Sequence, residues 1–305
     1  MKRWLFAGVL GASLVLASAA VAATVFVTPS NMHGWTPNHD SCGAVPSTGS
    51  QGFVNGPGDP PGPGTGSYAF TTGVNGDSYE TLRQGNLAGT KLADLTALSY
   101  STYVSHFGSG GQAVYIDLKV DVNGDGVADD TLTFEPIYQT GGYSGDSVPN
   151  QGQVVLNTWQ TWDALHGGWW TESSGTSGPP LVTLAHYVAQ HPNAQIVNTS
   201  TGGFRLSAGC GGLAWTNFAG NADNLTIGVK GQNVTYNFEL SQRGGGEGAG
   251  QGGAAAECKN GGWRHFTNPS FKNQGQCVSF FVHQRNAKKH EDAKHGGHHK
   301  KGHGD

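Results

Sequence analysis

A run of closely spaced oxygen-bearing side chains in the middle of the chain has the spacing of a calcium-binding loop. Asp121, Asn123 and Asp125 occupy alternate positions, Gly126 follows them, and Asp129 comes next among the acids. Calcium takes roughly six to eight oxygen ligands, and Asp and Asn side chains at this spacing supply them. The segment therefore predicts a structural calcium site with Asp121, Asn123, Asp125 and Asp129 as its side-chain ligands.

The same segment has a second interpretation, as a hairpin turn without metal. Leu132 stands where a calcium loop of the EF-hand type has a bidentate glutamate, so an EF-hand is excluded. Asn and Gly residues adopt positive φ in hairpin turns, and Asp side chains cap backbone amides there. Under this interpretation calcium is an optional occupant of the turn.

Tryptophans in the second half of the chain could provide a carbohydrate-binding surface. An exposed Trp ring can stack on the apolar face of a sugar, while polar side chains bind its hydroxyls. We predict ligand contacts from Trp162, Trp169, Trp170 and Trp215. Trp159 and Trp162 are an odd number of residues apart, so they point to opposite faces of one strand. Burial in the core is the alternative for each of these rings.

The chain lacks the sequence motifs of common hydrolases. There is no Gly-x-Ser-x-Gly elbow and no His-Glu-x-x-His helix. A glycosidase needs two carboxylates about 5–10 Å apart. The acids that a fold could bring together are Glu80, Asp117, Glu135, Asp163 and Glu172. No spacing singles out a pair, so no catalytic residue is predicted.

Alternating patterns on both sides of the acidic turn predict the strands that position it. One face of the first strand would carry Val114, Ile116, Leu118 and Val120, and the other Tyr115, Asp117, Lys119 and Asp121. Leu132 and Phe134 resume the alternation after the turn. Period-two patterning around an Asn/Gly/Asp cluster predicts two antiparallel strands.

Further strand-like segments follow at short intervals, and they predict an all-β chain. They are residues 24–27, 67–72, 78–84, 95–106, 154–162, 203–207, 225–229 and 233–240. Residues 46–66 are rich in Gly, Pro and Ser and predict a long surface loop. One short helix is expected at 181–190, after Pro179-Pro180 and before Pro192. The pattern predicts an antiparallel β-sandwich, or jelly roll.

Several of these segments together resemble bacterial extracellular jelly-roll domains of the galactose-binding-like or carbohydrate-binding-module kind. The resemblance rests on residues 91–100, on the hairpin with its Asn-Gly-Asp-Gly turn, and on residues 157–163 and 215–227. It covers roughly residues 65–240, and it implies a β-sandwich fold and a carbohydrate ligand. Residues 258–278 are similar to a short C-terminal motif of bacterial secreted proteins, with no assigned function. Neither resemblance supplies a catalytic residue.

The two ends of the chain are predicted to lie outside this domain. Residues 1–23 combine a positive start, an apolar run and the small-residue site Ala20-Val-Ala-Ala23, which is typical of a secretory signal peptide. A retained N-terminal anchor helix is the alternative. We expect a β-sandwich domain at 24–240, a Gly-rich linker at 241–257, a small disulfide-closed module at 258–284 and a disordered tail at 285–305.

Four cysteines allow three disulfide pairings, and an even number in an exported chain favours two disulfides. We expect Cys258 to pair locally with Cys277, which leaves Cys42 and Cys210 as a long-range pair. Zinc is the rival interpretation, but the chain contains no Cys-x-x-Cys pair.

Composition excludes some partners. The chain has a formal net charge of −4 and only 12% charged residues, which does not favour nucleic-acid binding. The tail could bind transition metals weakly through its histidines, which are His290, His295, His298, His299 and His303.

We expect a secreted or cell-surface, non-catalytic protein without a transmembrane segment in its mature form, with extracellular polysaccharide or cell wall as partner. A glycan-active hydrolase or lyase and a structural or adhesive surface protein are the alternatives.

Overall fold

The computed structural model describes residues 23–199, 202–240, 272–276 and 278–279. The predicted signal peptide, linker and tail, most of the C-terminal module and the Cys258–Cys277 bridge lie outside these residues. Within the described part of the chain, no helix has the length and apolar character needed to cross a bilayer.

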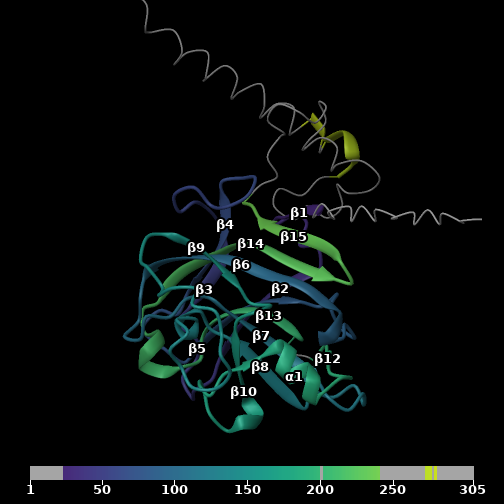
Figure 1. Ribbon diagram of the computed structural model, residues 1–305. Coiled ribbons are helices and arrows are strands. Elements are labelled where there is room, and N and C mark those ends of the chain that lie inside the picture. The colour runs from purple at the N-terminus through teal and green to yellow at the C-terminus, as the bar shows by residue number, and fades with distance from the viewer. Residues whose placement is uncertain (1–22, 200–201, 241–271, 277, 280–305) are drawn as a thin grey trace, which may run out of the picture.

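The described residues form two β-sheets, which confirms the predicted all-β sandwich (Figure 1). In Figure 1 the strands β6, β14 and β15 lie above β7, β8 and β10. The first sheet runs β1 (Ala23–Val27), β15 (Gln232–Phe238), β14 (Ala219–Val229), β4 (Gly66–Thr71) and β3 (Ser50–Asn55), and β6 (Leu95–His106) joins β14 to β9 (Trp159–Asp163). Every pairing in this sheet is antiparallel except that of β1 with β15.

The second sheet carries the predicted hairpin at its centre. Its order is β11 (Val182–Thr183), β10 (Gly168–Thr171), β8 (Asp130–Phe134), β7 (Tyr115–Asp121), β13 (Phe204–Gly209), β5 (Ser78–Gln84) and β2 (Trp35–Ser41), and β12 (Gln195–Ile196) also pairs with β7. Within the described residues up to 240, the helices are α1 (Leu184–Gln190) and the 3₁₀ turns Leu92–Asp94, Pro136–Tyr138, Glu172–Ser174 and Gly212–Trp215.

The hairpin has the two faces that its sequence predicts. In β7 and β8, Ile116 pairs with Phe134 and Leu118 with Leu132, and all four side chains are fully buried in the core. Successive side chains of a strand point to opposite faces. Because Ile116 and Leu118 face the core, the alternate residues of β7 lie on the outer face of the second sheet. That outer face carries the candidate site.

Three predicted elements differ from the observed ones. The helix begins at Leu184, not at 181, because Thr183 is its N-cap and accepts a hydrogen bond from the His186 amide, while Val182–Thr183 is strand β11. The predicted loop at 46–66 contains strand β3, which pairs with β4 and packs Phe53 edge-on against Tyr68. A strand rich in Ser, Gln and Gly has little local signal, so tertiary pairing decides it.

The third difference concerns the predicted strand at 154–162. Strand β9 begins only at Trp159 and ends at Asp163. Upstream, the Val155 amide donates to the side chain of Gln160 at 2.7 Å, so this segment folds back on the start of β9 and does not extend it.

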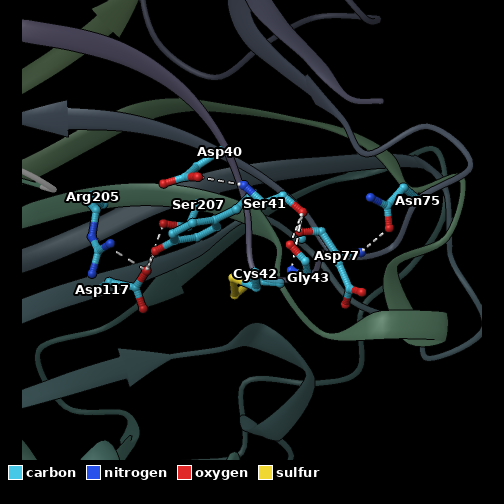
Figure 2. The surroundings of a disulfide bond; sticks show 12 residues. Asp40, Ser41, Cys42, Gly43, Asn75, Asp77, Asp117, Arg205 and Ser207 are labelled. Carbon is cyan, nitrogen blue, oxygen red and sulfur yellow. Dashed lines mark hydrogen bonds and ion pairs between the residues drawn. A yellow bond between two sulfur atoms is a disulfide. The ribbon is translucent and has the colours of Figure 1, made fainter. Parts of the chain in front are cut away.

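Cys42 and Cys210 form a disulfide, as the predicted long-range pairing requires (Figure 2). The bond joins the segment after β2 to the end of β13, with Cα atoms 5.3 Å apart and a sequence separation of 168 residues. Figure 2 shows Asp117, Arg205 and Ser207 to one side of this bond. The disulfide therefore anchors the strand that carries Arg205 and Ser207 close to the site described next.

Candidate functional site

A pocket of about 710 Å³ opens on the outer face of the second sheet. Backbone register places four of its residues side by side across the sheet: Arg205 pairs with Asp117, Asp117 with Thr133, and Thr133 with Trp170. The rim comes from residues 175–177 and from the connection between β13 and β14, including Gly211 and Trp215. Neighbouring strands that contribute alternate residues to one face thus build a row of polar and aromatic side chains.

Asp117 lies at the centre of this row and is the most heavily hydrogen-bonded acid of the pocket. This residue is 4% exposed. It accepts hydrogen bonds from the hydroxyls of Tyr79 at 2.9 Å, Thr133 at 2.8 Å and Ser207 at 2.8 Å. The Nε atom of Arg205 lies 3.9 Å from its Oδ2 atom. Three hydroxyl donors and a buried cation together hold this carboxylate in one orientation.

Glu135 is a half-buried acid at the end of β8, on the same face as Thr133. Trp170 donates from Nε1 to its Oε1 atom at 2.9 Å. Burial raises the pKa of Glu135 to about 7, and the charge of Asp117 adds to this shift. A carboxyl group that is protonated near neutral pH can donate a proton to a ligand. Diagonal neighbours of this kind in an antiparallel pair lie roughly 7–8 Å apart, which brings Glu135 near Asp117.

Glu172 is the exposed acid of the pocket, and its neighbours shift its pKa downward, opposite to the shift of Glu135. The Thr131 hydroxyl donates to its Oε2 atom at 2.6 Å, and Lys119 Nζ lies 3.4 Å from the same atom. The Thr131 hydrogen bond and then the charge of Lys119 lower the pKa of Glu172. The pocket therefore contains one acid that tends to keep its proton and another that tends to lose it.

Two buried polar atoms among the lining residues have no hydrogen-bond partner within the described part of the chain. They are Oε1 of Gln112 and Nε of Arg205. Both residues are largely buried, with 8% and 4% exposure. Burying a donor or acceptor without a hydrogen bond costs free energy. A ligand hydroxyl can donate to Gln112 Oε1 or accept from Arg205 Nε, so these two atoms favour a ligand that carries hydroxyl groups.

Of the predicted ligand-binding tryptophans, only Trp170 offers a partly exposed ring to this pocket. Trp162 and Trp169 are fully buried and donate to Thr102 and to the Ala164 carbonyl, so neither ring face is open to a ligand. They belong to the core because their strands turn these positions toward the other sheet. Trp215 lines the pocket but is 3% exposed and packs against Phe218.

The predicted calcium turn is closed by hydrogen bonds from its own backbone. Asp121 accepts from the amides of Gly124 and Gly126, and Asp129 accepts from the amide of Val122 at 2.7 Å. Asn123 and Asp125 each accept from the amide two residues ahead. These bonds are typical of the turn interpretation, and calcium at this turn stays a prediction. Among the described residues, no group of three or more His, Cys, Asp or Glu side chains is arranged to hold a metal.

Several pocket residues could not be predicted from the sequence. Tyr79, Gln112 and Arg205 were not predicted, although Tyr115, Asp117 and Lys119 were correctly placed on the polar face of their strand. The available signal was the alternation of Thr131, Thr133 and Glu135 on the partner strand. Because Thr133 pairs with Asp117 in the hairpin, this alternation places the Glu135 side chain on the same face as Asp117.

Comparisons with known proteins do not assign this pocket. No family model, no curated protein and no solved structure matches the chain. The geometry of the pocket is therefore the basis for proposing a function.

Proposed function

We propose that the protein is exported and binds a carbohydrate in the pocket on the outer face of the second sheet. The observation that carries this proposal is the buried Gln112 Oε1, which has no hydrogen-bond partner among the described residues, together with Arg205 Nε, which has only its ion pair with Asp117, in a pocket that also presents Trp170. A sugar supplies hydroxyls that can donate to one atom and accept from the other, and an apolar face for the indole ring. The resemblance to carbohydrate-binding jelly rolls supports the same ligand class.

Export is supported by two features. The long-range Cys42–Cys210 disulfide is typical of an oxidising compartment, and the first 23 residues have the pattern of a signal peptide.

Mutation of Trp170 to alanine is expected to weaken carbohydrate binding at least about tenfold, equivalent to about 1.4 kcal/mol. The reason is the loss of the one partly exposed tryptophan ring of the pocket. Binding is measured by screening the protein on a glycan array and then titrating the best oligosaccharide by calorimetry. Trp159→Ala is the matched control, because Trp159 is also half-buried but belongs to the first sheet and donates to the Pro57 carbonyl. An array without hits, or equal losses in both variants, would contradict the proposal.

We propose hydrolysis of a glycosidic bond as a second function, favoured by the opposite pKa shifts of two pocket acids. In this mechanism Glu135 is the general acid that protonates the leaving oxygen, since burial raises its pKa to about 7. Glu172, whose pKa is lowered, is the general base that takes a proton from the water molecule that attacks the sugar. Asp117 is a positioning residue that orients Arg205 and the surrounding hydroxyls.

Mutation of Glu135 to glutamine is expected to lower the rate of glycoside hydrolysis by about 10²–10⁴-fold while preserving binding. The wild-type rate should fall as pH rises through about 7, where Glu135 loses its proton, and as pH falls far enough to protonate Glu172. Release of reducing ends from the glycan identified on the array measures this rate. Equal rates for the wild type and the Glu135→Gln variant, or no release by either, would leave carbohydrate binding as the function and exclude hydrolysis through Glu135.

A further inference from the structure

Strand β3 lies at one end of the first sheet, and only one of its two edges is paired. Its partner is β4, in a register that places Ser50 opposite Thr71 and Asn55 opposite Gly66. No other strand in the described part of the chain pairs with β3. All of its residues are exposed or half-buried, which leaves the second edge accessible to a partner.

Hydrogen bonds at the two ends of the β3–β4 pair show which backbone groups of β3 face β4. At one end the Gly56 amide donates to the Thr65 carbonyl, in the register of the two strands. At the other end the Ser50 amide donates to the Thr71 hydroxyl. Antiparallel strands exchange backbone hydrogen bonds at every second residue pair. Residues 50, 52 and 54 therefore face β4 with their N–H and C=O groups.

The alternate residues of β3, which are Gln51, Phe53 and Asn55, direct their N–H and C=O groups away from β4. Among the described residues, none of these backbone groups has a hydrogen-bond partner. They form a row of donors and acceptors along the free edge, which is a template for pairing with another strand.

Folded proteins usually protect a free edge with charged residues, proline, a bulge, short length or a covering segment. In this chain β2 contains Pro37 and Asp40, and β11 has only two residues. Gln151 covers the end of β9 by exchanging two hydrogen bonds with the backbone of Asp163. Strand β3 has no charged residue and no proline, and its register with β4 is regular. Strand β1 is also uncharged, so the test below includes it.

The side chains of β3 fit a second copy of the same strand. Gln51 donates to the buried Glu80 and Phe53 packs against Tyr68, so the alternate residues Gly52 and Val54 face away from the core. In an antiparallel pair with a two-fold axis at Phe53, the free backbone groups of both strands meet. Gly52 then lies opposite Val54 of the second copy. A Cβ atom at Gly52 would meet nothing within 4 Å, so there is room for that side chain.

We propose that two copies of the protein associate through β3 and join their first sheets into one continuous sheet. A second copy is favoured over a charged peptide because β3 offers no charge that would select one. Pairing of two identical strands also satisfies two free edges at once and opposes no like charges. The lining of the carbohydrate pocket includes no residue of β3, so the association does not involve that pocket.

Sedimentation velocity of the purified protein over a range of concentrations tests this association. The wild type should change from monomer to dimer as the concentration rises. In Gly52→Lys/Val54→Lys the dimer dissociation constant should increase at least about tenfold, because lysines would lie directly opposite one another. The monomer should keep its fold and melting temperature. In the described structure a Cβ at Gly52 has open space, and Val54 does not pack against the core.

The variant Gly52→Glu/Val54→Lys tests the register of the pair. It places an acid opposite a lysine in each of the two cross-strand positions, so the dimer should return. Thr24→Lys, at an exposed position of β1, should dimerise as the wild type does. A charge-swapped variant that stays monomeric would overturn the pairing. So would a Thr24→Lys variant that is monomeric while the double-lysine variant still dimerises, since the contact would then lie at β1.

Hydrogen exchange of backbone amides provides a second readout. The amides of Gln51, Phe53 and Asn55 should exchange slowly only at concentrations where the dimer is populated. Those of Gly52 and Val54 face β4 and should be protected at every concentration. A wild type that stays monomeric throughout, or outward amides whose exchange does not depend on concentration, would overturn the proposal and leave the edge to a strand of another protein.

Discussion

Mutation of Asp117 to alanine is expected to lower the free energy of unfolding by about 3–5 kcal/mol. The variant would leave the buried Arg205 guanidinium without its carboxylate, and the hydroxyls of Tyr79, Thr133 and Ser207 without their acceptor. Each of these groups is costly to bury without a partner. Urea unfolding followed by tryptophan fluorescence measures the change.

Ser207→Ala is the matched control for this prediction. It removes one donor to Asp117 and leaves the carboxylate with Tyr79 and Thr133, so a loss of only about 1 kcal/mol is expected. If Asp117→Ala cost no more than Ser207→Ala, the network would not be a cooperative unit. It would then give no support to the view that Asp117 positions the pocket.

Replacement of both Cys42 and Cys210 by serine is expected to lower the free energy of unfolding by about 2–5 kcal/mol. The bridge closes a loop with a sequence separation of 168 residues, and long loops lose the most chain entropy when they are closed. Because Cys210 lines the pocket at the end of β13, carbohydrate affinity should fall as well. Urea unfolding of the variant and of the wild type gives the difference.

The double variant Cys258→Ser/Cys277→Ser controls for the second predicted bridge. It should leave the unfolding of the sandwich domain unchanged, because the Cys258–Cys277 bridge predicted from the sequence belongs to a segment outside the domain predicted at 24–240. Mass spectrometry of the non-reduced wild type should join Cys42 to Cys210. A stability loss in the Cys258/Cys277 variant equal to that of the Cys42/Cys210 variant would contradict the assignment of the long-range bridge to the sandwich.

The β-sandwich and its central hairpin could be predicted from the sequence because their signal is local. Alternation with a period of two assigned Ile116 and Leu118 to the core and Asp117 to the opposite face, and the structure has both. Strands β5 and β6 have the predicted bounds for the same reason. Strand β3 was missed because Ser, Gln and Gly form a strand only when a neighbour pairs with them.

The tryptophans show where local reasoning stops. The predicted strands include Trp162 but not Trp169, which the structure places on β10, and burial depends on which face of each strand meets the other sheet. Both are fully buried, while Trp170, one residue further along, reaches the pocket. Trp169 and Trp170 are consecutive, so they point to opposite faces of their strand, one into the core and the other into the pocket.

By itself, the sequence determined the all-β class, the two faces of the hairpin and the residues that each face presents, because these follow from the spacing of neighbouring side chains. Only the tertiary structure decided which acids share a pocket. Asp117, Glu135 and Glu172 come from β7, from the end of β8 and from the segment after β10, and sheet order brings them together. Contacts between distant segments depend on strand pairing, which no local pattern encodes.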